Sequence, residues 1–141
     1  MPENERVPIR EDLFTKPLSP ADEVRLVGGR CRECGEVSLG SSSVCPNCGR
    51  QEIEGITLSN KGQLWTFTVI RNRPPGDYKG PEPFTPFGLG LVELPEGIRV
   101  LSPIDCPIEK LRIGMDLELV IHKLYRDGKE NDVMAFKFRP A

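Results

Sequence analysis

The sequence is poor in the side chains on which most enzymes depend. It contains a single histidine, His122, although acid–base and nucleophilic catalysis uses this residue more often than any other. Aromatic residues make up only 6% of the 141 residues, and the formal net charge is −2, which argues against a general binder of polyanions. These shortages favour a binding or accessory role over independent catalysis.

Long apolar stretches are also missing. No run approaches the roughly 20 residues of a membrane-spanning helix, and residues 1–5 carry acidic side chains without the apolar segment of a secretory signal. The hydrophobic share of 38% is nevertheless too high for a disordered chain. We therefore expect a compact cytoplasmic protein, made of one domain or of one domain with a small module, and no membrane partner.

Glycine and proline are abundant, with 14 residues each, which predicts many turns and little helix. Prolines interrupt residues 1–28, so this segment is predicted to be an arm with one short helical turn near residues 19–23. Residues 29–55 hold four of the five cysteines and no large core side chain. Residues 56–141 form a third region, in which alternating apolar residues predict strands.

Five segments of this third region have the pattern of β-strands. Tight turns are predicted at residues 95–97 and 127–128, where glycine follows a polar side chain. An open sheet of five strands would leave two unpaired edges, so we expect the sheet to close into a small barrel. The predicted strands are 64–70, 88–94, 98–101, 115–122 and 134–138.

The cysteines form two Cys-x-x-Cys-Gly segments, with Cys31 and Cys34 in the first and Cys45 and Cys48 in the second. Two thiolates at this spacing can bind one metal ion, and the glycine permits the positive φ of a metal-binding knuckle. Two knuckles supply the four soft ligands of a structural Zn²⁺ site. Such a site leaves no open coordination position, so its predicted role is to fold a segment too small to have its own core.

Disulfides, a redox-active pair and an iron site are the alternative interpretations of the four cysteines. Disulfides need an oxidising compartment, to which nothing in the sequence directs the chain. A thioredoxin-like redox pair uses one Cys-x-x-Cys and leaves the second unexplained. Iron also accepts four thiolates, so the choice between zinc and iron stays open at this point.

The remaining candidates for chemistry are weak. Cys106 follows Asp105 in a bend, and this carboxylate does not favour a thiolate nucleophile. His122 lies on the polar side of its predicted strand, where a solvated side chain is the expected interpretation. No catalytic residue is therefore predicted, and an independent enzyme built on Cys106 or His122 is the weakest of the functional alternatives.

The segment 71–88 is the most informative part of the chain outside the cysteines. It is too long for a simple connection, and its prolines make it stiff, so it loses little entropy on docking. Stiff backbone, aromatic rings and cations suit a partner interface or contacts with phosphates, whereas the alternative is a loop that folds back over the barrel. The candidate side chains for partner or coenzyme A binding are Arg71, Arg73, Tyr78, Lys79, Phe84 and Phe87.

The two knuckles, together with residues 62–69, 86–94, 96–100 and 113–119, resemble a family of two-part proteins that accompany thiolases and other acyl-CoA enzymes. The resemblance covers roughly residues 29–139. It implies a mostly β fold, with an N-terminal rubredoxin-like zinc ribbon followed by a five-stranded OB-fold barrel. The implied organisation is an arm at 1–28, the zinc ribbon at 29–55 and the OB-fold domain at 56–141.

The resemblance also implies a role. The chain would be a non-catalytic, zinc-binding subunit in a hetero-oligomer, in which a thiolase-family partner supplies the chemistry and acyl-CoA or CoA binds at the interface. Residues 71–80 look most like the small subunit of the thiolase of anaerobic toluene degradation, which cleaves benzoylsuccinyl-CoA. Related members serve hydratases and aldolases, so the partner's reaction is left open. The alternative from a different class is a protein that binds single-stranded nucleic acid, for which the charge balance is unfavourable.

Overall fold

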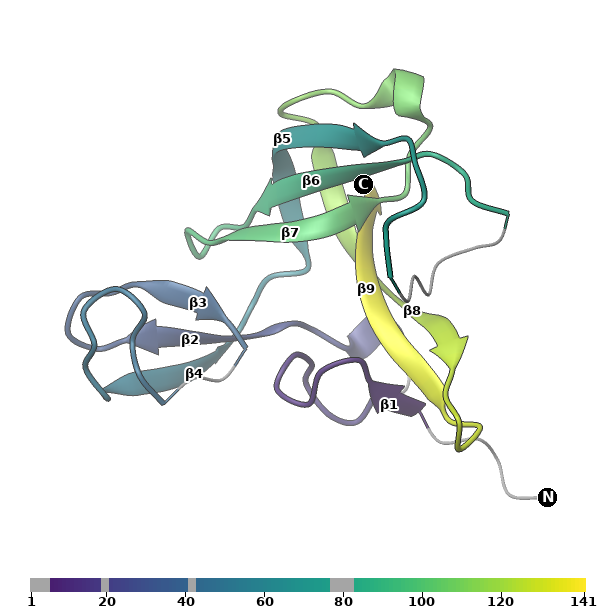
Figure 1. Ribbon diagram of the computed structural model, residues 1–141. Helices are drawn as coiled ribbons and strands as arrows, with labels where there is room; N and C mark the ends of the chain where they lie inside the picture. Colours follow the sequence, from purple (N-terminus) through teal and green to yellow (C-terminus); the bar gives the residue numbers. More distant parts are fainter. Residues whose placement is uncertain (1–5, 19–20, 41–42, 77–82) are drawn as a thin grey trace.

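The computed structural model describes residues 6–18, 21–40, 43–76 and 83–141 of the chain. A small three-stranded sheet lies beside a larger barrel (Figure 1). No helix within these described residues is long and apolar enough to cross a membrane. The strands are β1 (Arg6–Pro8), β2 (Val27–Cys31), β3 (Val37–Leu39), β4 (Ile53–Thr57), β5 (Lys61–Ile70), β6 (Phe87–Glu93), β7 (Arg99–Ile104), β8 (Asp116–Arg126) and β9 (Asp132–Pro140), and the 3-10 helices are η1 (Ala21–Glu23) and η2 (Ile108–Lys110).

The barrel consists of strands β5 to β9. Antiparallel pairing joins β5 to β6, β6 to β7, β8 to β9 and β5 to β8, and a parallel contact between Ile104 of β7 and Phe138 of β9 completes the circle. Each of the five predicted strands overlaps one of these five. This strand order is that of an OB-fold, so the predicted closed barrel is confirmed.

The barrel interior is filled by alternate residues of its strands, including Leu64, Val92 and Phe138, each at most 1% exposed. Gly90 also faces this interior. A Cβ atom at Gly90 would lie 2.6 Å from Cδ1 of Leu64 and 2.9 Å from the carbonyl oxygen of Thr66. Glycine at this position therefore lets the β5 side chains approach the β6 backbone closely.

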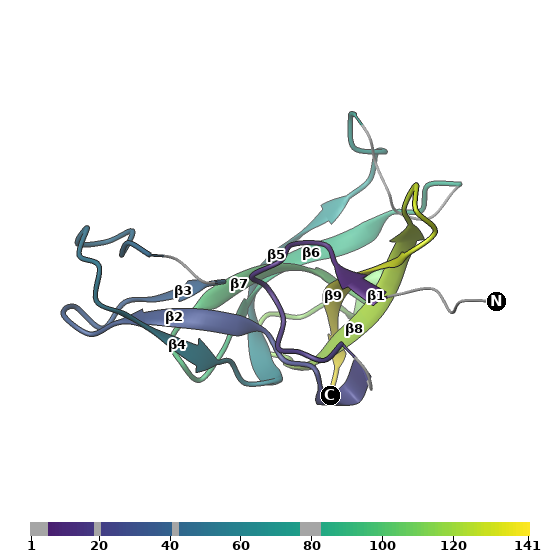
Figure 2. The same ribbon diagram turned by 90° about the horizontal axis from the view of Figure 1, so that it is seen from below.

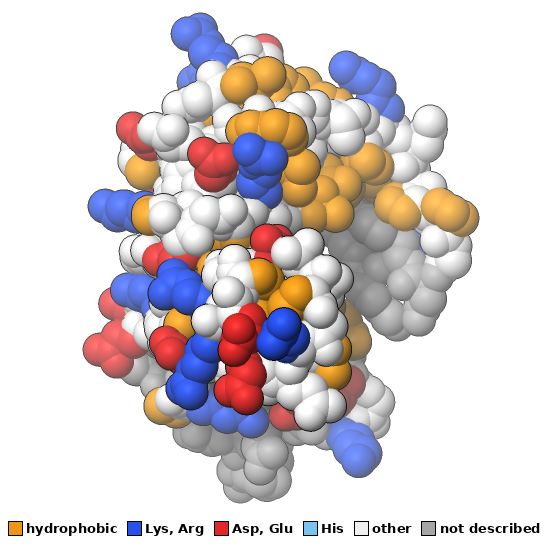
Figure 3. Space-filling model, turned by 90° about the vertical axis from the view of Figure 1, so that its left-hand side faces the viewer, with side chains coloured by type: hydrophobic (Ala, Val, Ile, Leu, Met, Phe, Trp, Pro, Cys, Tyr) orange, Lys and Arg blue, Asp and Glu red, His pale blue; other side chains and the backbone are white. Residues whose placement is uncertain are grey.

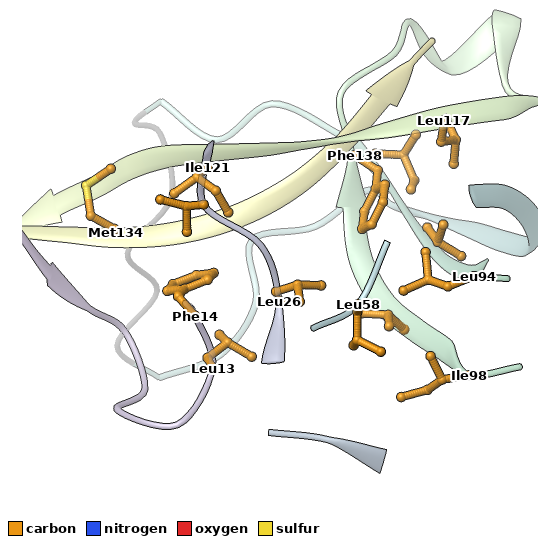
Figure 4. Packing of buried hydrophobic residues seen from close by; sticks show 14 of the residues in the cluster. Leu13, Phe14, Leu26, Leu58, Leu94, Ile98, Leu117, Ile121, Met134 and Phe138 are labelled. Atoms are coloured by element: carbon orange, nitrogen blue, oxygen red, sulfur yellow. The ribbon is translucent and has the colours of Figure 1, made fainter. Parts of the chain in front are cut away.

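The N-terminal arm is part of the barrel core. β1 pairs in parallel with the start of β9, and the two strands lie side by side in Figure 2. The predicted turn is present as η1. Apolar side chains before and after η1 point toward β8 and β9 (Figure 4), and the Phe14 ring meets the Phe136 ring edge-on at 6.3 Å. The buried arm residues are Leu13, Phe14, Leu18, Val24 and Leu26, each at most 8% exposed.

Strand β5 contains a β-bulge that the alternation of its sequence did not predict. The pairing with β6 shifts between Leu64 and Thr66, so one extra residue is inserted at Trp65. After the bulge, Phe67 and Val69 pack against the core, whereas the uninterrupted alternation put Thr66 and Thr68 on the face of Leu64. The bulge leaves Trp65 on the outside of the barrel, 45% exposed.

The small sheet has the order β3-β2-β4, and the cysteine knuckles lie in its β2–β3 and β3–β4 connections. A short linker, residues 58–60, connects it to the barrel. Leu58 is 1% exposed, and its N–H donates to the Leu26 carbonyl at 2.9 Å. Ser59 donates from its N–H and its hydroxyl to the two carboxylate oxygens of Glu96 at 3.1 and 2.6 Å. Glu96 lies in the β6–β7 turn, so this contact fixes the linker against the barrel.

Candidate functional site

The four ribbon cysteines converge on one point. Their sulfur atoms all lie within 4.8 Å of one another. The Cys31–Cys48 and Cys34–Cys45 sulfur pairs are each 3.6 Å apart. A tetrahedral zinc ion with Zn–S bonds of 2.3 Å requires sulfur separations of about 3.8 Å. The donor set and its spacing therefore fit a structural metal ion of this type.

The two knuckles have the same backbone geometry. In the first, the Gly35 N–H donates to the Cys31 carbonyl at 2.9 Å, and in the second, the Gly49 N–H donates to the Cys45 carbonyl at the same distance. Both glycines lie in the left-handed region, with φ of 80° and 77°. Other residues adopt this conformation at a cost, which explains why glycine follows the second cysteine of each pair.

The sulfurs differ in how readily they ionise. Hydrogen bonds from the Glu36 backbone N–H and the Asn47 side chain lower the pKa of Cys34 to about 6. The Arg50 backbone N–H lowers the pKa of Cys48, but desolvation and the three neighbouring sulfurs outweigh it and raise this pKa to about 12. Four sulfurs so close together do not all ionise easily, because neighbouring thiolates repel one another. A metal cation bound between them would offset this repulsion and stabilise all four as thiolates.

Charged side chains around the ribbon are paired with one another. Arg32 lies 3.5 Å from Glu54, and Arg50 lies 3.9 Å from Glu33. Figure 3 shows Lys or Arg and Asp or Glu interspersed on this part of the surface. A mixed surface of this kind lacks the continuous positive potential that phosphate-rich ligands need.

The cations predicted to bind a partner or CoA lie beyond the end of β5. Arg71 and Arg73 are both exposed. Tyr78 and Lys79 lie outside the described residues, so the structure does not place them. Binding of a partner or of CoA by these three cations and the Tyr78 ring therefore stays a prediction.

The two phenylalanines of the same segment lie together. The Phe84 and Phe87 rings meet edge-on with centroids 6.2 Å apart, and both are half-buried. Phe87 begins β6 and lines a hollow of about 640 Å³ on the side of the barrel. Phe87 thus belongs to a strand of the barrel itself, and both interpretations of the loop, a cover over the barrel and a contact with a partner, stay predictions.

His122 and Cys106 line the same hollow. His122 is half-buried, whereas the sequence predicted a solvated side chain, and desolvation by burial lowers its pKa below the usual histidine value. Its Nδ1 donates to the Lys123 carbonyl at 3.2 Å, and the Cys106 thiol donates to the Pro107 carbonyl at 3.5 Å. Each group thus bonds to the backbone beside it and not to the other. In the described part of the chain, they do not form the nucleophile–base pair of a cysteine enzyme.

The strand surface that OB-folds use for nucleic acids is apolar here. It corresponds to β6 and β7, whose outward side chains include Leu89, Leu91 and Leu101. These leucines are not among the site residues predicted from the sequence. The Gly-Leu-Gly-Leu run at residues 88–91 is the sequence pattern that indicates this surface. Its glycines face the barrel interior, so its leucines lie outside.

The comparisons with known proteins identify the family. The model described as "ChsH2, rubredoxin-like zinc ribbon domain" matches residues 19–54, and that described as "ChsH2, C-terminal OB-fold domain" matches residues 55–122. A DUF35 domain-containing scaffold protein of Methanocaldococcus jannaschii is 37% identical over 118 residues, which are 82% of this chain and 81% of the relative. The chain belongs to the DUF35 family of scaffold proteins.

Two further similar proteins carry the names of enzymes or of their subunits. The benzoylsuccinyl-CoA thiolase subunit BbsA of Thauera aromatica is 28% identical over 116 residues, covering 81% of this chain and 75% of BbsA. A solved structure entitled "Ltp2-ChsH2(DUF35) aldolase" superimposes with a TM-score of 0.58 at 29% identity, covering 82% of this chain and 84% of that one. The predicted membership in a zinc-ribbon and OB-fold accessory family is confirmed.

Proposed function

We propose that this DUF35 protein is a non-catalytic accessory subunit of a thiolase-type acyl-CoA enzyme. The observation that carries the proposal is the similarity to a thiolase subunit over 81% of the chain. Outside the four metal-site cysteines, Cys106 and His122 of the described residues bond to the backbone and not to each other, which supports the proposal because a partner would then supply the chemistry. The benzoylsuccinyl-CoA thiolase is the narrower candidate for that partner.

A structural Zn²⁺ held by Cys31, Cys34, Cys45 and Cys48 is part of this proposal. The ion cross-links the two knuckles and, with four thiolate ligands, has no position left for a substrate. The sulfur spacing and the matched knuckle geometry support the assignment. The role proposed for this metal site is therefore to stabilise the fold of the ribbon and not to bind substrate.

An aldolase-type partner is the second candidate, supported by the similarity to the aldolase complex. One experiment separates the two. The tagged chain is purified from its source organism, and the proteins that remain bound in stoichiometric amounts are identified and assayed with acyl-CoA substrates. We expect a thiolase-type subunit that cleaves a 3-oxoacyl-CoA with free CoA. Retro-aldol cleavage would favour the second candidate, and recovery of the chain with single-stranded nucleic acid would contradict both.

We further propose that the cations after β5 contact the phosphates of a CoA at the interface. The exposure of Arg71 and Arg73 supports this, because charge-assisted bonds to phosphate contribute about 1.5–3 kcal/mol each. Replacing Arg71 with Ala should raise KM for the acyl-CoA about tenfold in the assembled enzyme. Arg32→Ala, on the ribbon, is the matched control. An unchanged KM in Arg71→Ala would contradict the contact.

A further inference from the structure

The outward side of strands β6 and β7 is apolar over most of its length, and Trp65, Thr66 and Thr68 of β5 lie beside it. Pairing between strands places Leu91 beside Leu101 and Leu89 beside Pro103. All four side chains point away from the barrel interior, and Leu101 is 60% exposed. We call this surface the outer apolar face, defined by Trp65, Phe87, Leu89, Leu91, Leu101 and Pro103.

Two hollows meet on the outer apolar face. The smaller, of about 330 Å³, lies over β5 and β6, and the larger, of about 640 Å³, extends from Phe87 toward Phe136 of β9. Leu101 lines both hollows, so they form one continuous surface. Figure 3 shows hydrophobic side chains gathered on the barrel, above the mixed charges of the ribbon. Concave apolar sites of this kind accept the anchor side chains of a protein partner.

The charges at the margins of this face are matched within the chain. Arg99 lies 3.0 Å from Glu93, and its guanidinium stacks 3.8 Å from the centre of the Trp65 ring. Lys137, at the other end, lies 3.1 Å from Asp105. A phosphate backbone or a charged peptide would have to break these pairs. The complementary surface is therefore uncharged and mostly apolar, with a few polar groups to meet Thr66, Thr68 and His122, which also line the hollows.

We infer that the outer apolar face is the docking surface for the catalytic subunit, through an uncharged apolar segment with one side chain inserted beside Leu101. This inference rests on the proposed function and names the surface that performs it. Buried anchors in such hollows carry most of the binding energy of an interface, and truncating one weakens binding by thirtyfold or more. The arrangement places Phe87, at the start of β6, at one end of the same interface.

The test measures the dissociation constant between this chain and the catalytic subunit recovered by co-purification, using isothermal titration calorimetry. Leu101→Glu and Leu91→Glu should each raise the dissociation constant at least about thirtyfold. Ile113→Glu is the matched control, because Ile113 is 68% exposed and lines neither hollow. A photoreactive benzoylphenylalanine at position 101, but not at position 113, should crosslink to the catalytic subunit.

Each other outcome has a separate meaning. Wild-type affinity in Leu101→Glu, with no crosslink from position 101, would overturn this inference and leave the accessory role intact. A wild-type chain that binds no catalytic subunit would overturn the proposed function and this inference with it. A wild-type dimer in light scattering that Leu101→Glu dissociates would show that a second copy covers the face, which also overturns the inference.

Discussion

The ribbon and the barrel are stabilised by different interactions. In the ribbon, the buried side chains include the two first cysteines of the knuckles, Cys31 and Cys45, and its strands are short. The barrel and the arm share one apolar cluster, from Leu13 to Phe138, and the ribbon adds only the partly buried Val37, Leu39 and Ile56 at its margin. A small module without a core depends on its metal, whereas the barrel is stable through apolar burial. The difference predicts that each part can be damaged without destroying the other.

Replacing Cys45 with Ala should have the largest effect. It removes one of four ligands and a buried side chain from the ribbon, so zinc content should fall from about one ion per chain to nearly none. Amide signals of residues 29–55 should collapse to unfolded positions, while those of the barrel persist. Metal analysis and heteronuclear NMR measure the two effects.

Cys106→Ala is the control for this variant, because Cys106 lies outside the ribbon beside the barrel hollow. It should retain full zinc content and the wild-type spectrum of the ribbon. Unchanged zinc in Cys45→Ala would contradict the metal assignment. Loss of barrel signals along with the ribbon would contradict the independence of the two parts.

Phe14→Ala tests whether the arm belongs to the barrel. The ring is 4% exposed and packs on Phe136, and removing a buried phenylalanine costs about 3–5 kcal/mol of unfolding free energy. Zinc content should not change. Urea unfolding followed by Trp65 fluorescence gives the free energy, with the exposed Glu11→Ala as the control on the same arm. Equal stability of the two variants would mean that the arm is not part of the core.

Glu96→Gln tests the contact that joins the two parts. Losing the charged acceptor of both Ser59 bonds should cost about 1 kcal/mol, whereas Glu54→Gln, in an exposed ion pair, should cost little. Partial burial raises the pKa of Glu96, but the Ser59 hydrogen bonds and nearby Arg30 hold it below the usual glutamate value. The stabilisation that the ionised Glu96 carboxylate contributes is therefore complete above its pKa in the unfolded chain. It is lost as the pH falls through its lower pKa in the folded protein.

Thermal unfolding at several pH values checks this sign. The difference in Tm between wild type and Glu96→Gln should be largest near neutral pH and should narrow below about pH 4.3, the ordinary glutamate value. A difference that grows toward acid pH would show that the carboxylate is not stabilised in the folded state.

Local patterns predicted the ribbon and the barrel strands well. The four cysteines and two glycines lie close together in the sequence, and their spacing alone defines two knuckles. The five strands were found because apolar residues alternate along them. Both signals need only neighbours in the sequence, which is why they were readable without the structure.

The arm and the bulge depended on contacts between distant residues. Phe14 pairs with Leu26, and β1 pairs with β9 at the other end of the chain, so neither contact leaves a periodic pattern in residues 6–27. The bulge at Trp65 reverses which side of β5 faces inward. His122 was expected to be solvated because apolar and polar residues alternate along β8. It is half-buried because its side chain lies in the hollow that residues of β7 and β9 also line.

An initial-rate assay with a 3-oxoacyl-CoA and free CoA tests the accessory role most directly. It compares this chain alone, the co-purified catalytic subunit alone, and the two mixed at equal concentration. We expect no turnover by this chain and full turnover only in the mixture. Turnover by the isolated chain that disappears in Cys106→Ala would contradict the accessory role, because the chain would then carry its own nucleophile.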